Sequence, residues 1–156
     1  MLTKTSVSAL RLLLLIGSRD QSEPVSLKSA ATQLGESPTY LAKVARQLVR
    51  AGILRAQRGV AGGVTLNRLP TAVTLLATVE ACQGTILGDF CSDEANLRMT
   101  CAFHQASAEL HAAIVHVLSK WTLNDLLRQP APACAIKHGA GCWIQINAQK
   151  PKRRQR

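Results

Sequence analysis

The stretch SLKSAATQLGESPTYLAKVARQLVRAGIL, residues 26–54, most constrains the fold of this chain because it encodes two consecutive helices. Each predicted helix opens with serine, a good N-cap, and closes at glycine, a common helix end. Pro38 suits the first turn of the second helix. The signals predict a helix over 26–34 and another that ends before Gly52, joined by the tight turn GES.

The second of these helices has one apolar and one basic face. Its apolar residues recur at three- and four-residue spacing, which marks the buried side. The residues predicted to face outward are Thr39, Tyr40, Lys43, Arg46, Gln47 and Arg50. Such a pair of helices is typical of a helix-turn-helix, although a helical hairpin with no role in DNA binding has the same pattern.

A glycine-rich hairpin follows. Segments 53–57 and 64–66 have strand-like composition and are joined by RGVAGG, whose glycines are predicted to supply the turn conformations. A hairpin directly after the second helix of a helix-turn-helix is a wing. Three arginines, Arg55, Arg58 and Arg68, make it basic, and an arginine on a narrow tip can enter a DNA minor groove. The alternative is a structural hairpin with solvated arginines.

Helical patterns flank this region on both sides. Residues 6–17 predict a helix with one buried face and an exposed polar start at 3–6. Thr71 is predicted to cap a helix that runs to about Cys82. Residues 84–100 lack a clear period and are predicted to form a loop.

A long helix is predicted from Thr100, followed by a short one over 122–127. The apolar stripe of the long helix contains Phe103, Ala106, Leu110, Ala113, Val117 and Trp121. So apolar a surface does not stand alone in water, and we expect it to pack against a partner helix. Residues 130–156 are rich in Pro, Gly and basic residues, and we expect a poorly ordered tail there.

The charge balance favours an anionic partner. Nineteen Lys and Arg against nine Asp and Glu give a formal net charge of +10, of which the terminal PKRRQR supplies four charges. Arg11 interrupts the apolar N-terminal run and no cleavage site follows, so neither a secretory signal nor a membrane span is predicted, and we expect a cytoplasmic protein. In that compartment the five cysteines favour metal or redox chemistry over structural disulfides.

In the order of its elements the chain resembles the IscR-like bacterial transcription regulators of the Rrf2 family, over about residues 1–129. The pieces that carry the resemblance are Tyr40-Leu41, Arg58-Gly59 with Gly62-Gly63, and Thr122-Leu123 before Asp125-Leu126. The resemblance implies a mainly α fold: a winged helix-turn-helix with a small β-hairpin wing plus a long dimerisation helix. The expected divisions are a DNA-binding domain at 1–83, a cysteine-bearing sensor loop at 84–100, dimerisation and short helices at 101–129, and the tail at 130–156.

The resemblance also implies a homodimer that binds double-stranded promoter DNA and is no membrane protein. The residues expected by matching position in the major groove are Ser37, Thr39, Tyr40 and Lys43, and Arg58 with Gly59 are expected in the minor groove. Phosphate contacts would make the affinity fall steeply with salt.

Many members of the family hold an iron–sulphur cluster with three cysteines in the loop before the long helix. The run Cys101-Ala-Phe-His104 matches the end of that motif, and Cys91 is the natural third ligand, so a 2Fe–2S cluster is expected. The nine residues between Cys91 and Cys101, SDEANLRMT, lack the family's middle cysteine. Three alternatives stay open: a cluster with an unusual fourth ligand, a thiol switch without metal, and a loop that senses nothing.

The leading hypothesis is therefore a transcription regulator, most simply a repressor, whose DNA binding is controlled at the region from Cys91 to His104. A winged-helix module that binds an acidic protein is the main alternative; a small electron-transfer protein would leave the basic helix without a purpose. No catalytic constellation stands out, so we do not expect an enzyme. The remaining cysteines have simpler interpretations: Cys82 is predicted to be buried, and Cys134 and Cys142 to be incidental or redox-active.

Overall fold

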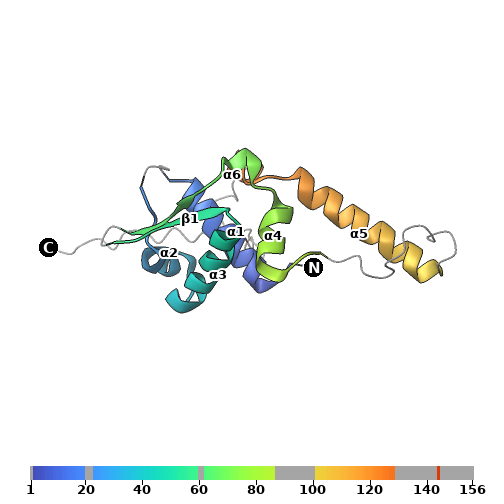
Figure 1. Ribbon diagram of the computed structural model, residues 1–156, viewed down its shortest axis with the longest axis horizontal. Coiled ribbons are helices and arrows are strands. Elements are labelled where there is room, and N and C mark those ends of the chain that lie inside the picture. The colour runs from blue at the N-terminus through green and yellow to red at the C-terminus, as the bar shows by residue number, and fades with distance from the viewer. Residues whose placement is uncertain (1, 20–22, 60–61, 87–100, 129–143, 145–156) are drawn as a thin grey trace, which may run out of the picture.

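A computed structural model describes residues 2–19, 23–59, 62–86, 101–128 and 144 of the chain. Its elements are α1 (Lys4–Gly17), α2 (Leu27–Leu34), α3 (Pro38–Arg50), β1 (Leu54–Gln57), β2 (Gly63–Leu66), the short 3-10 helix η1 (Pro70–Ala72), α4 (Leu75–Gln83), α5 (Ala102–Lys120) and α6 (Leu123–Arg128). Figure 1 shows α1 to α4, the hairpin and α6 gathered in one body, from which α5 projects. The fold is that of a winged helix, mainly α with a small antiparallel hairpin, as predicted.

Capping residues set the boundary between the two helices of the helix-turn-helix. The Ser37 hydroxyl accepts a hydrogen bond from the Tyr40 amide at 3.2 Å, which satisfies a free donor at the start of α3. Gly35 ends α2 in the left-handed conformation, with φ of 68°. The two helices are therefore fixed at their junction by the residues that the sequence singled out.

The wing is a hairpin that gains a third partner from the segment before α2. Strands β1 and β2 pair antiparallel with Leu54 opposite Leu66. Val25 then forms a bridge with Val64 through hydrogen bonds of 2.9 and 3.0 Å in both directions. This bridge attaches the base of the wing to the body.

The wing glycines serve two different purposes. Gly59 has φ of 113°, which glycine tolerates and other residues rarely adopt. Gly62 and Gly63 instead lie where a Cβ atom would meet backbone oxygens, 2.6 Å from Gln57 O and 2.5 Å from Val25 O respectively. For these two positions the requirement is close backbone approach rather than the turn conformation that the sequence predicted.

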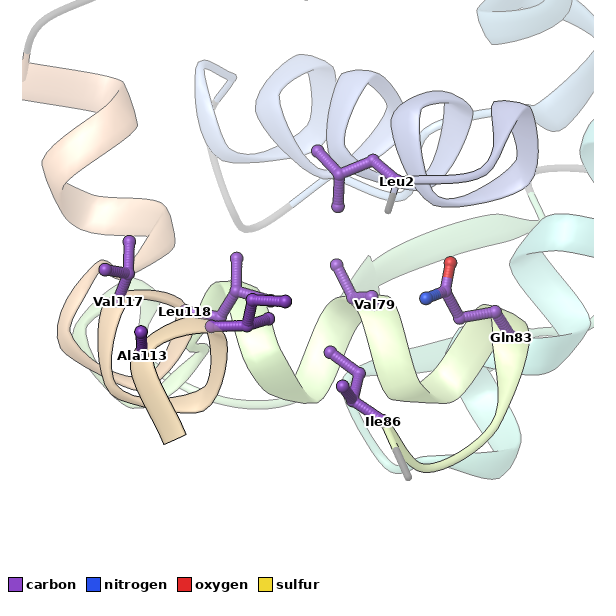
Figure 2. Close-up of a pocket in the computed structure, with 8 residues that line it drawn as sticks. Leu2, Val79, Gln83, Ile86, Ala113, Val117 and Leu118 are labelled. Carbon is purple, nitrogen blue, oxygen red and sulfur yellow. The ribbon is translucent and has the colours of Figure 1, made fainter. Parts of the chain in front are cut away.

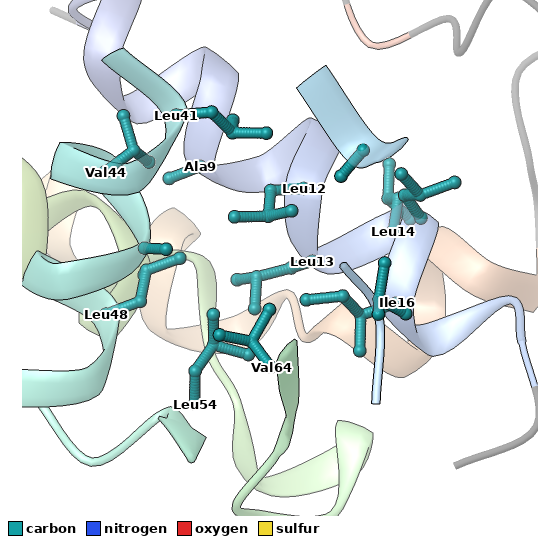
Figure 3. Packing of buried hydrophobic residues seen from close by; sticks show 14 of the residues in the cluster. Ala9, Leu12, Leu13, Leu14, Ile16, Leu41, Val44, Leu48, Leu54 and Val64 are labelled. Atoms are coloured by element: carbon teal, nitrogen blue, oxygen red, sulfur yellow. The ribbon is translucent and has the colours of Figure 1, made fainter. Parts of the chain in front are cut away.

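Helix α1 lies at the centre of the core. Leu12 and Leu13 are fully buried and pack with residues of α3 and the wing such as Leu41, Leu48 and Leu54 (Figure 3). Burying side chains of this size is worth about 1.5–3 kcal/mol each. The run of consecutive leucines in α1 therefore has neighbours on nearly every side, and the helix acts as the axis of the winged domain.

Two of the predicted helix starts differ from the structure. Thr71 lies in η1, and α4 is capped three residues later by the Thr74 hydroxyl, which accepts from the Ala77 amide at 3.1 Å. Helix α1 begins at Lys4 with Thr3 as its N-cap. Within the polar start that was predicted to be exposed, Ser6 is fully buried and donates to Gln83 Oε1 at 2.9 Å. Contacts with α4, distant in sequence, decide this burial.

The long helix α5 is attached to the body mainly at its C-terminal end. The Leu75 amide donates to the Trp121 carbonyl at 2.9 Å, and the Leu123 amide donates to the Val73 carbonyl at 2.8 Å. No residue of α5 is buried in the single chain, all of this helix being described. Among the described residues no helix is long and apolar enough to cross a membrane. The predicted loop beyond residue 86 and the predicted tail, apart from residue 144, lie outside the described residues.

Candidate nucleic-acid interface and cysteine site

The outer face of α3 carries exposed basic and polar side chains. Lys43, Arg46 and Arg50 are exposed, as are Ser37 and Thr39 at the start of the helix. Ser37 caps α3 and Pro38 lies in its first turn, and residues 37–39 are all exposed, so a ligand can reach this end of the helix. The arrangement gives a helix whose positive side chains point away from the core.

The wing also carries exposed basic side chains. Arg55 lies on β1, and Arg58 and Gly59 follow it; all three are exposed. Arg68, which the sequence also assigned to the basic wing, is exposed too and donates a hydrogen bond from Nη2 to the Ala51 carbonyl at 3.1 Å. It thereby satisfies a carbonyl just beyond α3 and ties the wing to that helix.

Two residues of α3 that were predicted to face outward, Tyr40 and Gln47, are only partly exposed. Tyr40 is half-buried: its hydroxyl lies 3.3 Å from Thr5 Oγ1, and the Lys4 ammonium lies 5.9 Å from its ring centre. Gln47 is half-buried too and donates from Nε2 to the Cys82 carbonyl at 3.3 Å. Each side chain faces a neighbouring helix because α1 and α4 flank α3, which a single-helix pattern does not reveal.

A carboxylate that sequence reasoning passed over lies in the turn before α3. Glu36 Oε1 accepts a hydrogen bond from the Ser8 hydroxyl at 2.9 Å and lies 3.7 Å from Arg11 Nη1. Arg11 also donates from Nη2 to the Leu34 carbonyl at 3.0 Å. The available signal was the arginine in the apolar run of α1, which calls for a buried anionic partner.

Cys101 and His104 form a close pair at the start of α5. Cys101 is the N-cap residue and is exposed, and its Sγ lies 2.9 Å from His104 Nδ1. The hydrogen bond from the His104 side chain holds the pKa of the Cys101 thiol below its ordinary value, and the backbone amide of His104 adds to the effect. The structure thus brings together two of the three predicted ligands.

The other cysteines divide between buried and undescribed. Cys82 is half-buried, and desolvation raises the pKa of its thiol to about 11, so it stays protonated and behaves as an apolar residue. Cys91, Cys134 and Cys142 lie outside the described residues. Within the part of the chain that the structure describes, no three His, Cys, Asp or Glu side chains come together as a metal site. Of the two described cysteines, Cys101 is the exposed one and the one whose pKa is lowered.

An apolar pocket of about 390 Å³ lies between α4 and α5, with Leu2, two residues before α1, at its edge. Figure 2 shows Leu2 above it, Val79 and Ile86 on the side of α4, and Val117 and Leu118 on α5. The apolar stripe of α5 borders the pocket and is itself open to solvent: Phe103, Leu110 and Val117 are 69%, 62% and 52% exposed. Pocket and stripe together form one apolar surface of a kind that marks an interaction site.

A winged helix with a basic second helix and a basic wing is the architecture of a DNA-binding regulator. Comparison with known proteins agrees: residues 2–129 match the Rrf2 family, described as iron-dependent transcriptional regulator. The chain belongs to this family. The family's members are transcription regulators, which is consistent with the absence of a predicted catalytic site.

Individual relatives give the same picture. The chain is 30% identical to the HTH-type transcriptional regulator NsrR of Geobacillus kaustophilus over 134 residues, which cover 83% of this chain and 91% of that one. Among solved structures it is similar to CymR, the global cysteine regulator of B. subtilis, with a TM-score of 0.70, 25% identity and coverage of 83% and 97%. The IscR of T. potens shares the fold, with a TM-score of 0.66, 23% identity and coverage of 83% and 87%.

Proposed function

We propose that the chain is a cytoplasmic transcription repressor that binds promoter DNA as a homodimer. The observation that carries the proposal is the set of exposed basic side chains on α3 and the wing: Lys43, Arg46 and Arg50 on the helix, and Arg55 and Arg58 on the hairpin. Arginine and lysine on such a surface neutralise DNA phosphates. A module that binds an acidic protein needs only the positive charges, whereas a basic helix followed by a basic wing is the arrangement that fits the two grooves of DNA.

In this proposal α3 enters the major groove and the wing follows the backbone into the minor groove. Ser37, Thr39 and Lys43 reach the bases or phosphates of the major groove from the open first turns of α3. Tyr40 joins them from its place against α1. Arg58 and Gly59 reach the minor groove, where glycine lets the hairpin come close to the DNA.

The homodimer forms through the apolar surface of α5. Its stripe recurs at seven residues, from Phe103 through Leu110 to Val117, as in helices that pair along their length. A second copy packed by a two-fold axis would cover both stripes at once and offer its α5 to the pocket beside α4. The two copies of α3 would then meet two half-sites of a palindrome.

Control of DNA binding belongs to the region from Cys91 to His104. Cys101 and His104 would hold a 2Fe–2S cluster together with Cys91, since thiolate and imidazole both bind iron and residues three apart lie on one face of a helix. When bound, such a cluster would supply a redox centre whose oxidation or loss changes the charge at the start of α5. This chain would contribute the Cys101 thiolate and the His104 imidazole, which lie together at the exposed start of α5.

A regulator that works by thiol chemistry without metal is the second candidate. It is favoured by the exposure of Cys101 and by its 2.9 Å contact with His104, which stabilises the reactive thiolate. A further crystal structure with the same fold is that of an oxidized form of Staphylococcus aureus CymR, at a TM-score of 0.66 and 24% identity. In this alternative, modification of the Cys101 sulfur alone changes the affinity for DNA.

The DNA proposal is tested by the salt dependence of binding. Lys43→Ala and Arg58→Ala should each weaken binding to a duplex selected by the wild-type protein and lower the slope of log K against log salt by about 1. Lys120→Ala, a change of the same charge in the last turn of α5, should leave the slope unchanged. Unchanged affinity in both test variants would count against the assignment of α3 and the wing.

Iron analysis separates the two sensing candidates. After anaerobic purification we expect visible absorption, iron and acid-labile sulphide in the wild type, and their loss in Cys101→Ala and His104→Ala. Cys82→Ala serves as the control, because that thiol is held protonated in an apolar environment. A colourless, iron-free wild type whose DNA binding is abolished by alkylation of Cys101 would replace the cluster with the thiol mechanism.

A further inference from the structure

Glu36 is an acidic residue in a part of the chain that is otherwise basic. Between Ser26 and Arg58 the sequence holds six lysines and arginines and this one acidic residue. It directly precedes Ser37, the N-cap of α3. A free carboxylate at this point would face the phosphates of any DNA that the helix approaches, and like charges so placed cost affinity.

The structure turns this carboxylate away from the exposed face of α3. The side chains of Arg11 and Glu36 are only 16% and 12% exposed, and the Ser8 hydroxyl donates to the same carboxylate oxygen, Oε1, that faces the guanidinium. The bond from Arg11 to the Leu34 carbonyl fixes the guanidinium at the end of α2. Arg11 thus neutralises the Glu36 carboxylate and holds it against α1, in the turn between α2 and α3.

We propose that Arg11 is a positioning residue for DNA binding: by pairing with Glu36 it removes a negative charge from the DNA face at the start of α3. The inference rests on the proposed function and adds a residue of α1, remote from the predicted DNA contacts, to the determinants of affinity. The Ser8 hydroxyl assists by holding the carboxylate in place, but it contributes no charge.

Charge variants of the pair distinguish this role from a purely structural one. Arg11→Met leaves Glu36 uncompensated, and we expect a loss of affinity of about tenfold or more at low salt, shrinking as salt screens the repulsion. Glu36→Gln should bind within about threefold of the wild type, and the double variant Arg11→Met with Glu36→Gln should bind like Glu36→Gln alone. Ser8→Ala, which keeps both charges, should have a small effect.

The measurement is fluorescence anisotropy on a duplex enriched by the wild-type protein from a random library, at low and high salt, with folding checked by circular dichroism. Arg128→Met on α6 is the matched control, since it removes the same charge away from the helix-turn-helix. If Arg11→Met does not fold, the double variant, which leaves no unpaired charge, decides by comparison with Glu36→Gln. A double variant about tenfold weaker than Glu36→Gln, or Arg11→Met binding like the wild type, overturns the inference. Failure to enrich any sequence would instead contradict the proposed function.

Discussion

At the scale of single residues, Gly63 shows how one missing side chain allows the wing to attach to the body. The backbone of Val25 lies so close that a Cβ at Gly63 would be 2.5 Å from its carbonyl oxygen. The same carbonyl accepts a hydrogen bond from the Val64 amide at 3.0 Å, so it cannot retreat without breaking the bridge. The position of the wing relative to α2 therefore depends on glycine.

Gly63→Ala should destabilise the protein by about 1–3 kcal/mol, the usual cost of forcing atoms into a close-packed site. Urea unfolding followed by circular dichroism measures this as a lower midpoint. Thr65→Ala on the same strand removes atoms instead of adding them and serves as the control. An unchanged midpoint for Gly63→Ala would show that the bridge moves freely.

At the scale of elements, the short helix α6 anchors α5 to the body. Asp125 accepts hydrogen bonds from the Thr122 hydroxyl at 2.6 Å and the Thr122 amide at 2.9 Å, so the residue before α6 and its first turn close on each other. On the other side Leu127 packs on α1, where a Cβ at Gly17 would come within 2.9 Å of it. A six-residue helix is too short to be stable alone, so the cap and this contact hold it.

The cap predicts a dependence of stability on pH. The Thr122 hydroxyl, with the Thr122 amide, lowers the pKa of Asp125 in the folded state. The stabilisation is therefore complete above the unfolded pKa of about 3.9 and is lost as pH falls through the lower folded pKa. Thermal unfolding of the wild type and Asp125→Asn from about pH 7 to pH 3 should show a difference that shrinks in acid. A difference that stays constant over this range would contradict the role of the cap.

At the scale of the whole molecule, helix α5 projects from the winged domain of its own chain, and its N-terminal end lies away from that domain (Figure 1). Its 19 residues span about 28 Å, and Figure 1 shows the N-terminal end far from the body. Cys101 and His104 occupy that far end, whereas Trp121 at the other end is bonded to α4. The contacts that α5 makes with α4 and with a second α5 would carry a change at the pair toward the winged domains, so dimerisation and sensing are expected to be coupled.

Leu110→Glu should convert the dimer to a monomer, because it places a charge in the middle of the apolar stripe. Sedimentation velocity measures the change in mass, and binding to a palindromic duplex should weaken at least tenfold when only one half-site is held. Ala112→Glu introduces the same charge on another side of α5 and is expected to remain dimeric. A Leu110→Glu protein that stays dimeric would locate the interface elsewhere.

The sequence by itself determined the features that depend on neighbours along the chain. Ser37 and Gly35 set the ends of α3 and α2, a basic face followed from helical spacing, and Cys101 and His104 meet because residues three apart share one side of a helix. These interactions are local, so the pattern alone encodes them. The roles of these residues in DNA binding and sensing, and the division of the chain into domains, remain predictions.

Only the tertiary structure decided the contacts between residues distant in sequence. The buried Ser6 hydroxyl donates a hydrogen bond to Gln83, and Gln47 points inward and donates to the carbonyl of Cys82 near the end of α4. The carboxylate of Glu36 is paired with Arg11. In each case a polar side chain finds its partner on another helix, and helical periodicity contains no information about which helices pack together. The physical reason is that a buried polar group must be satisfied by whatever the fold brings to it, and the fold is set by the whole core.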